Sequence, residues 1–252
     1  MRAISKEPTK HSLVAFGRCF AASSIMIATA VAVAPAACAQ SGAAAVFAVT
    51  YLDVGAGAVP QGVELIKKYR DQTRRENANL EFTILQETSR PNRFVIMEGW
   101  RDQAAFEAHD KGAAKVEFEG ALKPIRNSPP DRKMLQPFAN AAARPAPAGG
   151  ALFMLEHVDF LGGDPAIAAT AAPLVKALAD ASQKEAGAVR YEIYRMPPPR
   201  INHYEVVAAW TDAKAFDAHE TAAYTREFRA ATAQGGRAWR ANLYDQRLYK
   251  AL

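Results

Sequence analysis

Two copies of one short motif hold most of the residues of this chain that could carry out chemistry. The first copy runs from Trp100 to His109 and the second, 110 residues later, from Trp210 to His219, with Trp, Asp, Ala, Phe, Ala and His in the same places. A histidine changes its charge close to neutral pH, so His109 and His219 could transfer a proton or orient a bound phenol. These two histidines are therefore candidate catalytic residues.

Glu98 is a third candidate catalytic residue, and it occurs in one copy only. It precedes Trp100 by two positions, so both side chains point to the same face of an expected strand. If aromatic side chains bury that face, desolvation would raise the pKa of Glu98 and suit it to take a proton from a weakly acidic substrate. The second copy has Ala208 at this place. The alternative is a carboxylate paired with an arginine or exposed to water.

The aromatic residues of the motif are candidate substrate contacts. In each copy an acid, the phenylalanine and the histidine are spaced i, i+4 and i+7, so they share one face of a helix. Packing that face near the tryptophan would form a pocket between helix and sheet. The candidate substrate-binding residues are Trp100, Phe106, Trp210 and Phe216. In the alternative interpretation the tryptophans are core residues, and each histidine bonds a carbonyl to hold the helix break before Gly112 or Ala222.

The motif is part of a longer duplication. Continued without a gap to Leu122 and Thr232, the alignment matches at 10 of 23 positions. In the first copy, residue patterns predict strands at 46–52, 80–85, 93–100 and 131–138 and helices at about 60–77, 103–110 and 113–122. The second copy is expected to have strands at 152–160, 189–195, 203–210 and 241–252, with a long helix from Asp164. Asp102 and Asp212 are the expected N-caps of the short helices.

The order of elements in each copy, β-α-β-β-α-β, is that of a ferredoxin-like unit, and the fold class is α+β. Such a sheet carries helices on one face only. Both alternating sets of side chains in the strand 46–52 are largely apolar, so the second face must be buried too. We expect domains at 46–139 and 151–252, joined by an Ala/Pro/Gly-rich linker at 140–150 and packed sheet to sheet as an intrachain α+β barrel. Further association of this pseudo-dimer into homo-oligomers stays open.

The first 39 residues predict a secretory signal peptide. Basic residues precede an apolar run from Ala21 to Pro35, and Ala37-Cys38-Ala39 is a small-x-small cleavage pattern. The run is shorter than the about 20 residues of a membrane-spanning helix, so we expect a periplasmic or secreted protein with no membrane span in its mature form. Lipid attachment at Cys38 is the less favoured alternative, because the residues before it lack the usual leucine.

Composition argues against several other classes of function. The leader's net charge of +3 comes from Arg2, Lys6, Lys10 and Arg18 against Glu7. The chain's formal +5 less this +3 leaves +2, and no basic patch with aromatic residues favours binding to nucleic acid. Both cysteines, Cys19 and Cys38, also lie in the leader, which leaves no thiol for disulfides or metal ligation. Motifs of zinc proteases, phosphate-binding loops and serine hydrolases are missing, so we expect no metal and no cofactor.

The strands of the second copy carry more polar residues than those of the first. These residues are His157, Asp159, Arg190, Glu192 and Tyr194. They either line a cavity between the sheets or form an internal ion-pair network, and we favour the network. His203 is expected in a surface turn.

The chain resembles the antibiotic biosynthesis monooxygenase family of the dimeric α+β barrel superfamily, over about 46–138 and 151–250. The likeness is carried by Glu98-Gly-Trp100, Asp102, Ala105-Phe106 and Ala108-His109, and by Ala209-Trp210, Asp212, Ala215-Phe216 and Ala218-His219. It implies subunits that pair through their sheets, here fused into one chain. Members similar to quinol monooxygenases oxidise phenols or quinols with O₂ and without metal, flavin or haem. The deprotonated substrate supplies the electrons, so the protein need provide only a dry pocket, a proton acceptor and orientation.

The resemblance thus implies an exported, cofactor-independent monooxygenase-like protein that oxidises a small quinol or polyphenol. Because Ala208 departs from the family's carboxylate before the tryptophan, one half could be active and the other a structural partner. Two alternatives stay open: a non-catalytic barrel that binds a small hydrophobic ligand, and a haem-binding member of the superfamily that uses His109 or His219. The strands 46–52 and 152–160 contain no Asn, which haem-degrading relatives use on the first strand, and this weakens haem degradation.

Overall fold

The computed structural model describes residues 44–144, 150–160, 165–234, 241–242 and 246–252. The expected signal peptide and Cys38 lie outside these residues. The strands are β1 (Val46–Asp53), β2 (Asn79–Glu87), β3 (Arg93–Trp100), β4 (Asp131–Ala139), β5 (Leu152–Phe160), β6 (Ala188–Arg195), β7 (His203–Trp210), β8 (Ala241–Asn242) and β9 (Arg247–Ala251). The helices are α1 (Val59–Thr73), preceded by the 3-10 turn η1 (Ala56–Ala58), and α2 (Gln103–Asp110), α3 (Ala113–Leu122), α4 (Pro165–Ser182), α5 (Ala213–Thr221) and α6 (Ala223–Gln234).

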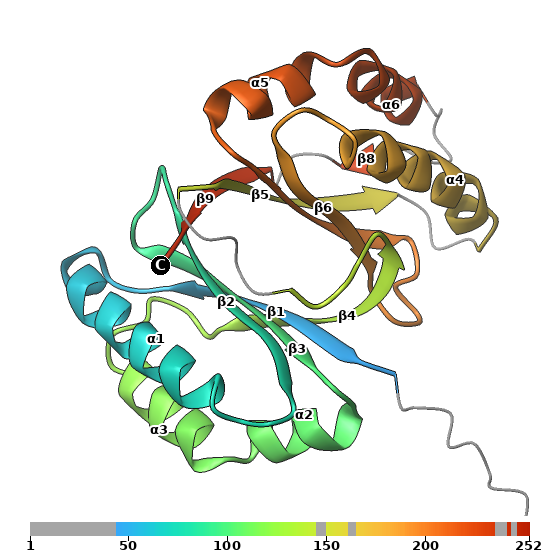
Figure 1. Ribbon diagram of the computed structural model, residues 1–252. Coiled ribbons are helices and arrows are strands. Elements are labelled where there is room, and N and C mark those ends of the chain that lie inside the picture. The colour runs from blue at the N-terminus through green and yellow to red at the C-terminus, as the bar shows by residue number, and fades with distance from the viewer. Residues whose placement is uncertain (1–43, 145–149, 161–164, 235–240, 243–245) are drawn as a thin grey trace, which may run out of the picture. The chain divides into compact units, whose positions relative to one another are not determined.

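Eight of these strands close into one antiparallel barrel that both copies build (Figure 1). Neighbouring strands follow the order β7-β6-β4-β1-β3-β2-β9-β5, and pairing of β5 with β7 closes the ring. The two-residue β8 pairs with the end of β5. The copies are joined where β4 pairs with β6 and where β2 pairs with β9. The expected α+β fold with an intrachain barrel is therefore confirmed.

Local sequence signals set where the helices begin. Pro60 stands in the first turn of α1, where its missing N–H costs no hydrogen bond. The side chain of Asp102 accepts a hydrogen bond from the backbone N–H of Ala105 (2.8 Å), and that of Asp212 accepts one from Ala215 (2.9 Å). The two predicted N-caps of α2 and α5 are confirmed. No helix in the described parts of the chain is both long and apolar enough to span a bilayer.

Most boundaries lie within two residues of the expected ones, and three other differences are notable. Helix α1 ends at Thr73, not near residue 77, and residues 74–78 form a turn that leads into β2. The last strand, expected as one element, is described as β8 and β9. His203 is the first residue of β7 and not part of a surface turn, because the strand's pairing with β5 extends to this residue.

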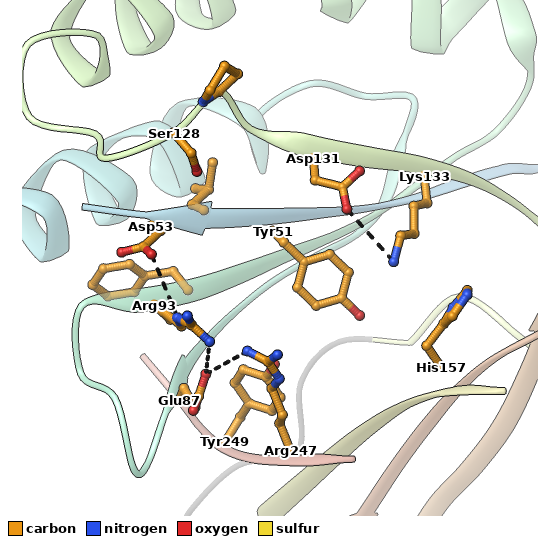
Figure 2. A pocket seen from close by; sticks show the side chains of 13 residues that line it. Tyr51, Asp53, Glu87, Arg93, Ser128, Asp131, Lys133, His157, Arg247 and Tyr249 are labelled. Carbon is orange, nitrogen blue, oxygen red and sulfur yellow. Dashed lines mark hydrogen bonds and ion pairs between the residues drawn. The ribbon is translucent and has the colours of Figure 1, made fainter. Parts of the chain in front are cut away.

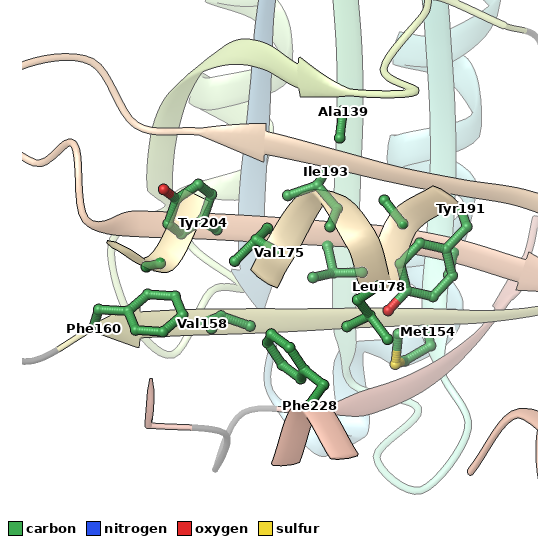
Figure 3. Packing of buried hydrophobic residues seen from close by; sticks show 14 of the residues in the cluster. Ala139, Met154, Val158, Phe160, Val175, Leu178, Tyr191, Ile193, Tyr204 and Phe228 are labelled. Atoms are coloured by element: carbon green, nitrogen blue, oxygen red, sulfur yellow. The ribbon is translucent and has the colours of Figure 1, made fainter. Parts of the chain in front are cut away.

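Side chains that alternate along the strands fill two kinds of core. The barrel interior is apolar in its middle, with Phe47, Val49, Leu85, Val95, Met97, Leu135, Phe153, Leu155, Tyr194, Val207 and Tyr249. The outer face of the first copy packs against α1 and α3 through Ile66 and Phe118. In the second copy α4 lies against the sheet, where Val175 and Leu178 belong to the same buried cluster as Met154 (Figure 3). Both faces of each sheet are thus buried, as the apolar pattern of the first strand predicts.

Candidate functional site

Glu98 lies on the helix-facing side of β3, buried between Trp100 and His109. Its Oε2 accepts a hydrogen bond from the indole Nε1 of Trp100 (3.0 Å) and lies 3.7 Å from Nε2 of His109. The imidazole stacks on the indole with ring centroids 4.3 Å apart. Glu98 is 3% exposed, and the two rings are buried as well. The structure thus brings together three residues that the sequence singles out, and the observed partners of the carboxylate are an indole and an imidazole.

Both ring nitrogens of His109 have partners, and they link Glu98 to the surface. Nε2 lies 2.7 Å from the hydroxyl of Tyr69 on α1, and Nδ1 lies 2.9 Å from Oε1 of Glu76 in the turn after α1. The side chain of Glu76 is 36% exposed, whereas that of His109 is 1% exposed. Burial raises the pKa of Tyr69, and Glu98 and Glu76 raise it further, so this phenol stays protonated. His109 therefore lies between the buried Glu98 and the partly exposed Glu76.

Phe106 covers the same site from α2. It packs in a small cluster with Trp100 and Ala48, and the guanidinium of Arg132 lies 5.2 Å above its ring. Nη2 of Arg132 donates to Oδ2 of Asp110 at the end of the helix (3.0 Å). The phenylalanine and this ion pair therefore hold α2 against the sheet beside the buried carboxylate.

The second copy repeats the pairing of tryptophan and histidine. The ring centroids of Trp210 and His219 lie 4.8 Å apart, and Phe216 meets the indole at a steep angle with centroids 5.3 Å apart. Trp210 and His219 are buried, and Phe216 is partly buried. The structure brings these three residues together as it does their counterparts, although Ala208 leaves no carboxylate at the place of Glu98.

One carboxylate, Glu185, holds both rings of the second copy. The indole Nε1 of Trp210 donates to Oε2 of Glu185 (3.0 Å), and Nδ1 of His219 lies 3.0 Å from Oε1, which also accepts from the hydroxyl of Tyr224. Glu185 lies in the turn after α4, as Glu76 lies in the turn after α1. A histidine that ties the short helix to this turn is therefore common to both copies, whereas a buried acid two positions before the tryptophan occurs in the first copy only.

In the alternative role that the sequence leaves open, each histidine bonds a carbonyl, but the observed partners of the two imidazoles are Tyr69, Glu76 and Glu185. The backbone carbonyls of both histidines do close the helix ends. The carbonyl of His109 accepts from the N–H of Gly112 (2.8 Å), and that of His219 accepts from Ala222 (3.1 Å), so each closes the end of its short helix. The sequence analysis missed Tyr69, Glu76 and Glu185. The two glutamates could have been found, since each follows its long helix at the same distance before the second strand of its copy.

A further buried carboxylate, Glu156, was also missed. It lies on the helix-facing side of β5 and is 7% exposed. Burial raises its pKa to about 7, although the nearby Arg229 on α6 lowers it. Arg229 in turn pairs with Glu220 (2.7 Å). The second copy thus holds a buried acid at a different strand position from that of the first.

A cavity of about 270 Å³ lies at one end of the barrel, which we call the barrel mouth (Figure 2). Its walls include Tyr51, Glu87, Arg93, Lys133, His157 and Tyr249. Arg93 lies 3.9 Å from Glu87, which also lies 3.4 Å from Arg247, while Nζ of Lys133 lies 4.8 Å above the ring of Tyr51. Residues of both copies form this space, so joining the copies creates it. The carboxylates of Asp53, Glu87 and Asp131 line it beside these cations, so its size and its mix of aromatic and charged groups suit a small polar aromatic molecule.

A carboxylate and a histidine stand at the wall of the barrel mouth. Glu205 is fully buried, accepts a hydrogen bond from the hydroxyl of Tyr51, and lies 3.1 Å from Nδ1 of His157 through Oε2. Burial lowers the pKa of His157, but the carboxylates of Asp159 and Glu205 outweigh this effect and raise it to about 9. His203 lies beside the same Asp159. The sequence leaves two alternative roles for His157 and Asp159, in a cavity lining or in an ion-pair network, but does not connect them with His203.

The opposite end of the barrel is closed by an ion-pair network. Nη1 of Arg190 lies 3.0 Å from Oε1 of Glu81, and its Nη2 contacts Glu192. Glu192 also accepts from the hydroxyl of Tyr194 (3.0 Å) and lies 3.0 Å from Nε of Arg144. The internal network predicted for the polar residues of the second copy is confirmed here, whereas His157 lines the cavity at the other end.

Comparison with known proteins places the chain in a family. The sequence profile of the family described as antibiotic biosynthesis monooxygenase matches residues 45–119 and 162–231, once in each copy. None of the curated proteins compared with the chain is similar to it.

Several solved structures share the fold over most of their length. A candidate monooxygenase from Fusobacterium nucleatum subsp. nucleatum superposes with a TM-score of 0.69 at 14% identity, over 83% of this chain and 93% of its own. A candidate monooxygenase from Lactobacillus acidophilus NCFM gives 0.63 at 15% identity, over 82% and 93%. An anthrone oxidase-like protein gives 0.61 at 12% identity, over 82% and 91%. At these identities the likeness shows the fold. The two profile matches cover more than half of the chain, which therefore belongs to the antibiotic biosynthesis monooxygenase family.

Proposed function

We propose that the chain is a cofactor-independent monooxygenase that oxidises a small quinol or polyphenol with O₂ at the helix-facing site of the first copy. The observation that carries the proposal is the buried Glu98, held between Trp100 and His109 and joined through the imidazole to the half-exposed Glu76. A carboxylate in this position can accept a proton from a phenol bound beside it.

The reaction needs only groups that a protein side chain and O₂ supply. Glu98 takes the proton of a phenolic hydroxyl, and the resulting anion gives an electron to O₂. Recombination of the two radicals forms a C–O bond, and loss of one water from the peroxide leaves a hydroxyquinone. The substrate supplies all four electrons, one oxygen atom enters the product, and the other leaves as water. The aromatic walls of Trp100 and Phe106 would orient the ring and exclude water.

Access to Glu98 sets a condition on this proposal. Trp100 is fully buried and Glu98 is 3% exposed, so a substrate reaches the carboxylate only when α2 moves away from the sheet. This helix has eight residues and is held by the Asp102 cap and by the pair between Asp110 and Arg132. Opening must therefore also break the packing of Phe106 and the contacts of His109 with Tyr69 and Glu76.

Oxygen consumption with a panel of small quinols tests the proposal. We expect Glu98→Gln to lower kcat at least about 100-fold, because the amide keeps an acceptor for the indole of Trp100 but is not a base. The matched control is Glu156→Gln, which removes a buried carboxylate of similar exposure on the helix-facing side of the second copy. Turnover in His219→Gln, compared with the wild type, would show whether the second copy also oxidises the substrate. No turnover above the spontaneous rate in the wild-type protein, or full activity in Glu98→Gln, would rule the proposal out.

The cavity at the barrel mouth favours a second candidate function, binding of a small ligand without catalysis. Its aromatic and charged walls fit a phenol or an aromatic acid better than a purely hydrophobic molecule. Ligand binding that persists unchanged in Glu98→Ala and His109→Ala, together with no oxygen consumption, would favour this candidate. Haem binding has less support, because both ring nitrogens of His109 are engaged and His219 is packed against Trp210.

We further propose that the protein is exported, on the strength of the basic and apolar leader and its small-x-small pattern near residue 39. The mass of the protein recovered from a bacterial periplasm would show whether the leader is cleaved. A mass that includes the leader, or recovery from the cytoplasm alone, would contradict export. Attachment of a lipid at Cys38 would appear as membrane association that is lost in Cys38→Ser.

A further inference from the structure

Four polar side chains of the second copy stand as neighbours on one patch of the barrel interior. His157 and Asp159 are two positions apart on β5, so they point to the same face, and the register of β7 places Glu205 opposite His157 and His203 opposite Asp159. All four are less than a quarter exposed. Strands of a rigid barrel therefore hold two imidazoles and two carboxylates within reach of one another.

We propose that His157, Asp159 and His203 bind one divalent first-row transition-metal ion, such as Zn²⁺. One potential ligand atom from each of the three residues lies within 4.8 Å of the others. Two imidazoles and one carboxylate are a ligand set that such ions favour, and three protein ligands leave a coordination position open. The proposal concerns the barrel mouth and is independent of the proposed reaction at Glu98.

The contacts of Asp159 are those of a ligand and not of an ordinary hydrogen-bond acceptor. Its Oδ1 lies 2.7 Å from Nε2 of His157 and also contacts Nδ1 of His203. Neither ring N–H points at this oxygen, which is buried and has no directional hydrogen bond from any described residue. Because these atoms are in direct contact, an ion can bind among them only if they separate. Bonds of about 2.0–2.2 Å to the ion would require these atoms to move apart by less than about 1 Å.

The first copy holds a cation at the equivalent place. There the register pairs Asp53 with Arg93, as it pairs Asp159 with His203 in the second copy. Nε of Arg93 lies 3.7 Å from Oδ2 of Asp53. The duplication has thus kept the aspartate in both copies but exchanged the guanidinium for an imidazole, which is neutral when it acts as a ligand.

The surroundings of His157 support the same conclusion. Its Nδ1 is held by Glu205, which is held in turn by the hydroxyl of Tyr51 from the first copy. A carboxylate on one ring nitrogen fixes the ring so that the other nitrogen faces the ion, and it makes that nitrogen a better donor. His157 also lines the cavity of the barrel mouth, so the open coordination position would face a space large enough for a small phenolate or carboxylate.

The guanidinium of Arg200 would compete with a bound ion for the imidazole of His203. Nη2 of Arg200, in the turn before β7, lies 3.3 Å from Nδ1 of His203. Because this contact is exposed, the guanidinium can swing into solvent at little cost. Removing Arg200 should therefore leave metal affinity unchanged or increase it, whereas an ion-pair cluster without a metal would respond to this change in stability only.

Metal titration of the tag-free full chain tests the proposal. After treatment with a chelator, Zn²⁺ is titrated by calorimetry and Co²⁺ by its visible absorption, which reports coordination directly. We expect one ion per chain with a dissociation constant below about 10 µM. His203→Ala and Asp159→Asn should weaken binding about 100-fold or more, and Tyr51→Phe about 10-fold, since partners behind metal ligands are worth about 10- to 100-fold. Circular dichroism confirms that each variant is folded.

His219→Ala is the matched control, because it removes an imidazole from the helix-facing side and should leave affinity unchanged. Glu98→Gln should bind the ion like the wild type, so loss of oxidation and loss of metal binding are separable. Absence of stoichiometric binding in the wild-type protein would overturn the proposal. So would equal affinity in His203→Ala and Asp159→Asn, or equal weakening in His219→Ala.

Discussion

Arg190→Met should remove the cation that pairs with two buried carboxylates inside the closed end of the barrel. Arg190 is 2% exposed and lies between Glu81 and Glu192, which are 3% and 0% exposed. Breaking a buried ion pair by removing one partner costs about 3–5 kcal/mol. Glu192 keeps Nε of Arg144 at 3.0 Å and the hydroxyl of Tyr194, so we expect the lower end, about 3 kcal/mol, at pH 8. Methionine fills most of the volume of the arginine stem, which limits the loss of packing.

The pH dependence of the unfolding free energy distinguishes the cost of an unpaired buried charge from the cost of lost packing. Burial already raises the pKa of Glu192, while Arg190 lowers it, so removing the arginine raises that pKa further. A carboxyl whose pKa is raised in the folded state destabilises the fold above that pKa, and the penalty disappears as pH falls toward the unfolded value. Urea unfolding at pH 8 and pH 5 should therefore show a smaller cost at pH 5. Lys176→Met, in an exposed pair with Asp180, should cost less than about 0.5 kcal/mol at either pH. An equal cost of Arg190→Met at both pH values would refute the reasoning.

Three further substitutions test the fold. Gly187→Ala should destabilise the protein by about 3 kcal/mol in thermal or urea unfolding, because φ is +84° and the new methyl group would lie 2.7 Å from a Cβ on α5. Gly57→Ala is the control and should be nearly neutral, because its methyl group would meet nothing within 4 Å. Asp110→Asn should cost about 1 kcal/mol at pH 7: its arginine partner lowers the pKa of the carboxyl, so this stability is present above the ordinary pKa and is lost as the pH falls through the lowered one, which urea unfolding at a series of acidic pH values would show. Phe153→Ala, at a fully buried position in the barrel interior, should cost about 3–5 kcal/mol, whereas Val116→Ala, 63% exposed, should change stability by under about 0.5 kcal/mol.

The sequence predicts most elements because their signals are local. The predicted bounds are correct for the helix 113–122 and for three strands, 93–100, 152–160 and 203–210. The strand bounds are clear because runs of β-branched and aromatic residues stop at turn residues. The barrel itself follows from two apolar faces on one strand together with a duplicated chain. The end of α1 was placed too far along, because residues 74–77 are compatible with a helix and only the tertiary contact of Glu76 distinguishes the turn.

The site was predicted only in part, because its contacts join distant elements. The spacing of Glu98, Trp100 and His109 on a strand and a short helix shows that they can meet, and they do. Tyr69 and Glu76 come from a helix whose rotation about its axis depends on packing, which spacing does not reveal. The barrel mouth could not be predicted, since it depends on which strands of the two copies become neighbours.

The same register explains how one chain can carry the two different sites proposed above. In a dimer of identical subunits, every side chain at the barrel mouth and under each short helix would occur twice. Here only the first copy has a carboxylate, Glu98, two positions before its tryptophan on the strand. Only the second copy has an imidazole, His203, opposite the aspartate. In a symmetric pair each substitution would appear at both equivalent sites, including the one where it does not suit the surroundings. Fusion removes that constraint, so the first copy could specialise under its helix while the second specialised at the mouth, with Tyr51 bonded across to Glu205.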